Sequence, residues 1–144
     1  MISFEEQKKI SRTRIRDAKI LLNNGSYDSA LYLCGYSIEV ALKAIICKNL
    51  NIGGLESASH VPSTKQDFEI ISKLKTHNTE DLLALVPSTI SLEIKSKKFA
   101  DWSTVQKWNP EMRYAPIQGR KIKAESINVI QATEKILRYL WRQI

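Results

Sequence analysis

Residues 27–50 read YDSALYLCGYSIEVALKAIICKNL and form the most apolar stretch of the chain. Its apolar side chains leave little polar surface around a helix; they are Ala30, Leu31, Leu33, Cys34, Ile38, Ala41, Leu42, Ile45 and Ile46. A helix that is apolar nearly all round is normally buried. We therefore predict a helix from Ser26 or Tyr27 to about Leu50, at the centre of the fold and packed on several neighbours.

The segment before this stretch is predicted to form a long helix from Phe4 to Asn24. Ser3 followed three residues later by Glu6 is the pattern of a capping box at a helix start. Gly25 is suited to the position just after a helix end. Two helices joined by so short a turn should form an antiparallel hairpin.

Further helices are predicted in the second half of the chain. We expect a short helix within 67–74, a helix start at Asn78, a helix capped by Ser88 that runs to about Ala100, and a last helix over 121–142. The helix from Ser88 should make its apolar contacts through four residues, which are Ile90, Leu92, Ile94 and Phe99.

No long stretch alternates between apolar and polar residues, as a half-buried strand would. Residues 51–66 are rich in Gly, Ser, Pro and Thr and are predicted to form a mobile loop. The prediction is therefore an all-α fold, a single-domain up-and-down bundle of four to five helices over residues 1–144.

Composition places the chain among ordinary globular domains. It has 144 residues, of which 43% are hydrophobic and 26% charged, which argues against a mainly disordered chain. Cys34 and Cys47 would lie about 20 Å apart on one helix, too far for a disulfide. We predict that both are buried, reduced thiols. The two cysteines and two histidines do not match the spacing of a zinc site, and we expect no cofactor.

The ends and the apolar stretch predict a cytoplasmic protein. The N-terminus carries acids where a secretory signal would be basic, and no apolar run follows it. The apolar stretch from Ala30 to Ile46 is interrupted by Glu39 and Lys43 and falls short of the roughly 20 residues of a membrane span. We therefore expect no membrane partner.

The net charge of +7 suggests an anionic partner, although many soluble domains are basic for solubility alone. Much of the charge is concentrated in residues 95–123, which contain eight basic residues and two acidic ones. Trp102, Trp108 and Tyr114 lie among them, a mixture that suits phosphate contact and base stacking. A solvated surface over core tryptophans would give the same pattern.

Candidate site residues are the polar side chains that interrupt apolar surroundings. Glu39 and Lys43 are four residues apart in the most apolar helix, so they form either an internal ion pair or the polar floor of a shallow site. His77 lies just before a predicted helix start. Arg113 and Tyr114 lie between two prolines, where Arg113 would contact a phosphate or hold the loop to Glu39 or Asp81.

The run from Tyr27 to Ala44 resembles the second helix of HEPN-domain proteins, with its aromatic and alanine residues followed by Gly35-Tyr36, Glu39 and Leu-Lys-Ala. Thr76-His77 with Asp81-Leu82 and Leu85 is similar to the family's His-Asp-Leu segment, and Trp108 through Arg113-Tyr114 to its late Arg-Tyr segment. The resemblance implies a helical bundle, usually a homodimer. It also implies prokaryotic defence or toxin–antitoxin systems, often beside a minimal nucleotidyltransferase.

Active members of that family are metal-independent ribonucleases with an Arg-x(4–6)-His motif, which this chain lacks. The positions five to seven residues before His60 and His77 hold no arginine. The resemblance therefore implies a non-catalytic protein that binds a nucleotide, RNA or a partner protein through six residues, which are Tyr36, Glu39, Lys43, His77, Arg113 and Tyr114. The alternatives are a ribonuclease with His77 as general base and Arg113 as charge stabiliser, or a structural dimerisation module.

Overall fold

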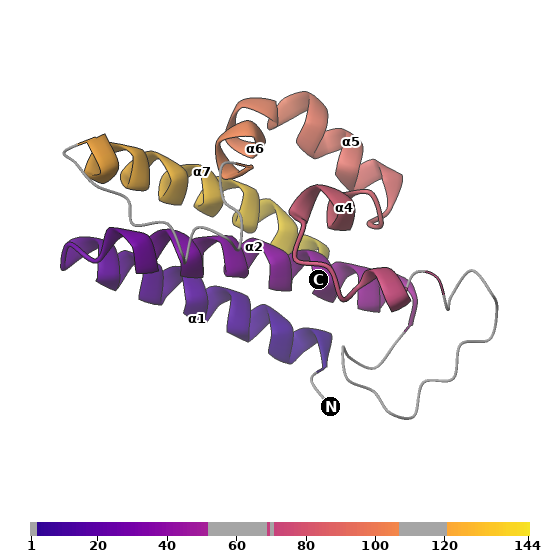
Figure 1. Ribbon diagram of the computed structural model, residues 1–144. Coiled ribbons are helices and arrows are strands. Elements are labelled where there is room, and N and C mark those ends of the chain that lie inside the picture. Colours follow the sequence, from indigo (N-terminus) through magenta and orange to yellow (C-terminus); the bar gives the residue numbers. More distant parts are fainter. Residues whose placement is uncertain (1–2, 52–68, 70, 107–120) are drawn as a thin grey trace.

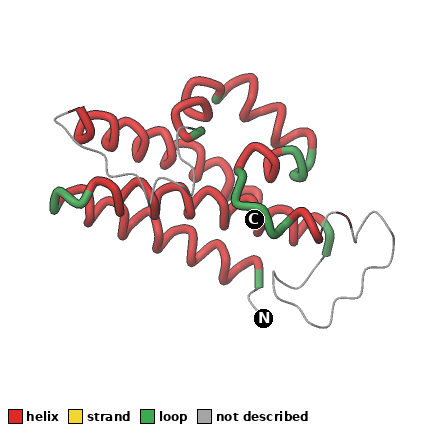
Figure 2. Tube along the Cα trace, in the orientation of Figure 1, coloured by secondary structure: helices red, strands yellow, loops and turns green. Residues whose placement is uncertain are grey.

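The computed structural model describes residues 3–51, 69, 71–106 and 121–144. All regular elements with assigned bounds in those residues are helices (Figure 1 and Figure 2): α1 (Phe4–Asn23), α2 (Tyr27–Asn49), α4 (Thr79–Leu83), α5 (Ser88–Lys97), α6 (Phe99–Val105) and α7 (Lys121–Gln143). The predicted all-α fold is confirmed. The helices outnumber the four to five expected because several short ones lie between α2 and α7. Apart from Asn51, the predicted loop at 51–66 lies outside the described residues.

The predicted capping box begins α1. The Ser3 hydroxyl accepts a hydrogen bond from the Glu6 N–H at 3.2 Å, and the Glu6 carboxylate accepts one from the Ser3 N–H at 2.8 Å. The Ser3 N–H bond is the main cause of a pKa of Glu6 below its ordinary value. The polar pattern of Ser3 and Glu6 therefore fixes where the helix starts.

Gly25 ends α1 and reverses the chain. Its φ of 78° lies in the left-handed region that glycine adopts without strain. The Gly25 N–H donates to the Leu22 carbonyl at 3.1 Å, and the Ser26 N–H donates to the Leu21 carbonyl at 2.9 Å. This is the Schellman arrangement that satisfies the last carbonyls of a helix. The predicted α1–α2 hairpin follows from it.

The helices α1, α2 and α7 lie alongside one another and form the body of the fold (Figure 1). Ser11 of α1 joins them, because its hydroxyl donates to the Ser37 carbonyl at 2.7 Å and accepts from Trp141 Nε1 at 2.9 Å. Along α2 and α7, Cys34 contacts Thr133 while Lys48 contacts the carbonyl of Ile144. These two helices therefore run parallel, and α1 runs antiparallel to both.

The central position predicted for α2 is confirmed. Its side chains contribute much of the buried core, including Ile38, Ala41, Leu42 and Ile46, each with an exposed fraction of 0%. By length and composition alone α2 is apolar enough to cross a membrane, contrary to the expectation from its two charges. However, 78% of its apolar window is buried inside the bundle, as in the core helix of a globular protein.

Both cysteines are buried and free, as predicted. Burial raises the pKa of the Cys34 thiol to about 12, and it also raises that of Cys47. The Cys34 S–H donates to Thr133 Oγ1 at 2.9 Å. Since the thiolate is the reactive form, Cys34 serves packing rather than chemistry.

The segment from α4 to α6 is only partly as predicted. Asn78 begins α4 by accepting a hydrogen bond from the Asp81 N–H at 3.1 Å, which confirms that helix start. The cap expected at Ser88 is wrong, because Pro87 occupies the capping position and no side chain caps α5. The predicted helix to Ala100 is wrong as well, because it breaks at Lys98, and α6 then packs on α7.

Two of the four apolar residues expected to make contacts are exposed instead. Ile90 and Ile94 are buried, as expected, but Leu92 is 66% exposed and Phe99 is 62% exposed. Ile90 and Ile94 are four residues apart and share the face of α5 that packs on the core. Leu92 lies two residues from each and points to the opposite face, and Phe99 is the first residue of α6, so the contacts expected of Leu92 and Phe99 are wrong.

Candidate functional site

Glu39 of α2 is the centre of a buried polar cluster. Its Oε1 atom lies 2.8 Å from Lys43 Nζ and 2.9 Å from His77 Nδ1. The Glu39 and Lys43 side chains are only 4% and 10% exposed, whereas that of His77 is 54% exposed. The ion pair considered for Glu39 and Lys43 is therefore present, and His77 joins the buried carboxylate to the surface.

The cluster fixes the orientation of the His77 ring. A carboxylate only accepts hydrogen bonds, so Nδ1 of His77 carries the hydrogen that it shares with Glu39. In the neutral ring, Nε2 is then an acceptor. The other Glu39 oxygen, Oε2, is buried and has no hydrogen-bond partner among the described residues. Such an atom is costly to bury, which marks this point as more than ordinary core.

Tyr36 lies one turn before Glu39 and contacts the same histidine. Its ring meets that of His77 edge-on, with the centroids 6.2 Å apart. On the other side it meets Tyr32, with centroids 4.8 Å apart and a hydrogen bond of 3.0 Å between the hydroxyls. Helical spacing along α2 therefore aligns Tyr32, Tyr36 and Glu39 in one ridge.

A hollow of about 450 Å³ lies between α1 and α2 beside this ridge. Its lining is mostly apolar and aromatic, with Arg14 as its charged residue: Gln7, Ile10, Arg14, Tyr32, Leu33, Tyr36 and Val40. Arg14 lies 4.0 Å from Asp17, and its side chain is 43% exposed. The guanidinium therefore keeps donors available to a ligand.

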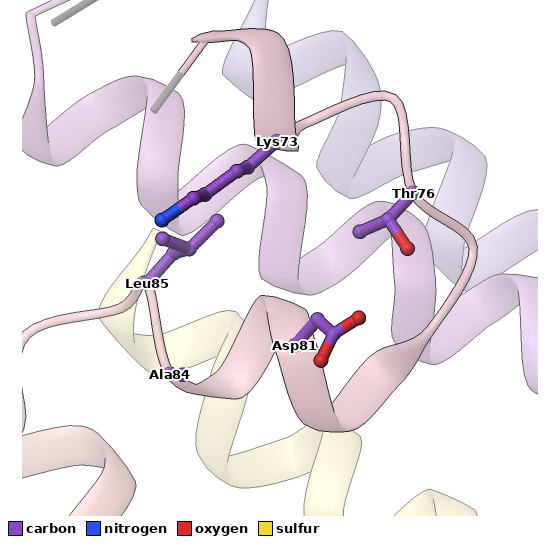
Figure 3. A pocket seen from close by; sticks show the side chains of 5 residues that line it. All are labelled: Lys73, Thr76, Asp81, Ala84 and Leu85. Atoms are coloured by element: carbon purple, nitrogen blue, oxygen red, sulfur yellow. The ribbon is translucent and has the colours of Figure 1, made fainter. Parts of the chain in front are cut away.

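A second hollow, of about 380 Å³, lies beside α4, and its lining includes Thr76, the residue before His77. Figure 3 shows its lining side chains: Lys73 and Leu85, with Thr76 from the preceding loop and Asp81 and Ala84 on the α4 side. It offers one cation, one carboxylate and a hydroxyl.

The structure brings together four of the six predicted site residues, namely Tyr36, Glu39, Lys43 and His77. Arg113 and Tyr114 lie outside the described residues. Sequence reasoning missed Arg14 and Tyr32. The spacing of Tyr32 and Tyr36 on one helix face was a usable signal, but nothing in the α1 segment distinguishes Arg14 from its neighbouring cations.

Within the described part of the chain, no three His, Cys, Asp or Glu side chains gather as metal ligands would. The groups that gather are instead a histidine, a lysine, a carboxylate and tyrosines. They are suited to hydrogen bonding, proton transfer and stacking on a planar ligand.

A comparison with known families matches residues 4–53 to the HEPN domain, which covers α1 and α2. The resemblance seen in the run from Tyr27 to Ala44 is thereby confirmed. No curated protein and no solved structure matches the chain significantly.

Proposed function

Since α1 and α2 match the HEPN domain family, we propose that this chain is a non-catalytic HEPN-domain protein that binds a nucleotide in the hollow between these two helices. Its setting would be a prokaryotic toxin–antitoxin, defence or stress-response system in the cytoplasm. A homodimer and a minimal nucleotidyltransferase partner belong to the same proposal.

One observation carries the choice of ligand: two tyrosines and an arginine line a hollow of about 450 Å³. This volume lies in the range of small-molecule sites, which are mostly apolar with a few placed polar groups. A planar base would stack against Tyr32 or Tyr36. Arg14 would hold a phosphate, because its planar guanidinium matches phosphate oxygens.

The buried cluster of Glu39, Lys43 and His77 favours an anionic ligand in this hollow and holds the Tyr36 ring in place. Lys43 is occupied by Glu39, so it neutralises a carboxylate that would otherwise repel a phosphate. His77 contacts both Glu39 and the Tyr36 ring, so it limits the positions of that ring. The absence of the Arg-x(4–6)-His motif supports binding without cleavage.

A change of Arg14 to glutamine tests the nucleotide site. Wild-type protein should melt at a higher temperature with ATP or GTP, since a ligand at about a hundred times its Kd adds about 2.7 kcal/mol of stability. Arg14→Gln should weaken binding by about ten- to a hundredfold, because a charge-assisted hydrogen bond contributes about 1.5–3 kcal/mol. Differential scanning fluorimetry across a nucleotide titration measures both effects.

Arg16→Gln is the matched control for that experiment. Arg16 lies on the same helix and contacts the same Asp17, at 3.7 Å, but it does not line the hollow. Its removal should leave nucleotide affinity unchanged. Equal losses in the two variants, or no thermal shift with any nucleotide, would contradict the proposed site.

The Glu39–His77 contact favours one second candidate, a ribonuclease. A carboxylate that accepts from Nδ1 leaves Nε2 of a half-exposed histidine able to take a proton from a ribose hydroxyl. Our proposal predicts that purified protein does not cleave RNA, as measured by gel electrophoresis after incubation. Cleavage that disappears in His77→Ala and Arg113→Ala but persists in His60→Ala would establish the enzyme instead.

A further inference from the structure

We propose that the adjacent surfaces of α1 and α7 bind the phosphate backbone of a double-stranded nucleic acid, without regard to its sequence. We call this surface the α1/α7 face, and it consists of six cations: Arg12, Arg16, Lys19, Lys135, Arg138 and Arg142. This inference goes beyond the nucleotide site and does not depend on it.

Contacts between the two helices align the cations in two neighbouring rows. Lys19 Nζ lies 2.9 Å from Glu134, and the Arg12 guanidinium lies over the Trp141 ring, 5.2 Å from its centroid. Arg138 reaches the same Glu134 at 3.6 Å. Because α1 and α7 run antiparallel, the rows lie side by side in the second half of α1, from Arg12 to Lys19.

The cations of the face are available to a ligand. The exposed side-chain fractions are 70% for Arg16, 50% for Lys19, 65% for Lys135 and 71% for Arg138. Three carboxylates offset half of the charge; they are Asp17, Asp101 and Glu134. Glu134 is 19% exposed and is shared by Lys19 and Arg138, so it positions these cations more than it neutralises the surface.

The lysines of α5 and its end carry a smaller excess of positive charge than the α1/α7 face. Lys95 pairs with Glu80 at 3.6 Å, and Lys97 and Lys98 both pair with Glu93, so three cations stand against two carboxylates. Trp102 is 2% exposed and belongs to the core, as the alternative interpretation of that segment required. Residues 107–120 lie outside the described residues.

The chemistry of the face favours a duplex over other polyanions. Four of its six cations are arginines, which match phosphate oxygens with two parallel hydrogen bonds. The rows lie on two neighbouring helices, so one row can contact phosphates on each side of a duplex groove.

Single strands and membranes fit the α1/α7 face less well. Single-strand sites present open aromatic rings, whereas Trp141 lies under Arg12 and its N–H is taken by Ser11. A membrane surface site needs an apolar face, and Ile20 is the one large apolar side chain in the described part of α1 that is exposed.

The test is binding of a short, fluorescently labelled duplex of arbitrary sequence, measured by anisotropy between about 50 and 200 mM salt. Wild-type affinity should fall steeply with salt. Arg16→Gln/Arg138→Gln removes two highly exposed cations and should weaken binding about tenfold or more at low salt. It should also reduce the slope of the logarithm of affinity against the logarithm of salt concentration, by the amount expected for about two lost phosphate contacts.

Lys95→Gln/Lys97→Gln removes the same charge from α5 and is the control, with an expected change of less than about twofold. Arg14→Gln should also keep duplex binding, which separates this inference from the nucleotide site. Circular dichroism confirms that each variant is folded. Equal losses in the two double variants, no duplex binding by wild type at low salt, or tighter binding to a labelled single strand or to vesicles of anionic lipid would overturn the proposal.

Discussion

Replacing Lys43 with methionine should lower the free energy of unfolding by about 3–5 kcal/mol, because the Glu39 carboxylate would stay buried without its counter-charge. Methionine keeps most of the lysine stem, so little of the loss would come from packing. The Glu39 side chain is 4% exposed, so little water is at hand to replace the lost ammonium group. Chemical denaturation, followed by circular dichroism, measures the loss.

Replacing Glu39 instead of Lys43 should lower the free energy of unfolding by less. In Glu39→Leu the remaining charge belongs to Lys43, whose long side chain is 10% exposed and can extend its ammonium group into solvent. The double variant Glu39→Leu/Lys43→Met should recover most of the stability, since well-packed apolar residues can replace a buried ion pair without loss. A double variant as unstable as the sum of the two single variants would contradict this account.

Glu93 and Lys97 provide a matched control on α5. They have the same spacing and orientation as Glu39 and Lys43, but their side chains are 27% and 73% exposed. Lys97→Met should change stability by less than about 1 kcal/mol, because water replaces the lost partner. If Lys43→Met and Lys97→Met cost the same, the burial of the Glu39 cluster would have no energetic consequence.

The buried pair also shows how much of the site was predictable. Two charges four residues apart in an apolar helix predict an ion pair from the sequence alone, and the pair is present. The resemblance to HEPN-domain proteins grouped His77 with this pair, but no local pattern predicted its contact with Glu39, because 34 positions of chain separate His77 from Lys43. Long-range contacts of this kind depend on the packing of α4 against α2.

The fold was predictable wherever a local pattern determines a local structure. Ser3 with Glu6, Gly25, and Asn78 with Asp81 each act through hydrogen bonds to nearby backbone, and all three are found as predicted. Residues 88–105 carry no such signal at their bend. Lys98 is neither glycine nor proline, and the break there allows α6 to reach α7, which is a tertiary requirement.

The second large effect on stability concerns the buried face of α5. Ile94→Ala should lower the free energy of unfolding by about 2–5 kcal/mol, because Ile94 is fully buried and its removal leaves a cavity. Leu92→Ala, on the same helix, should change it by no more than about 0.5 kcal/mol, because Leu92 is 66% exposed. Urea denaturation of the two variants beside wild type gives both values.

The comparison of Ile94 with Leu92 tests which face of α5 packs on the core. Ile90 and Ile94 are four residues apart and share the face of α5 that turns to the core. Leu92 lies two residues from each and points to the opposite face, so its loss should be small whether or not the helix continues past Lys98. Both changes remove three carbons from one helix, and the helix propensities of Ile and Leu differ by only a few tenths of a kcal/mol, so the difference in loss reports burial. A loss above about 2 kcal/mol for Leu92→Ala would mean that α5 packs through the face that is exposed here, or that a second copy of the chain covers it.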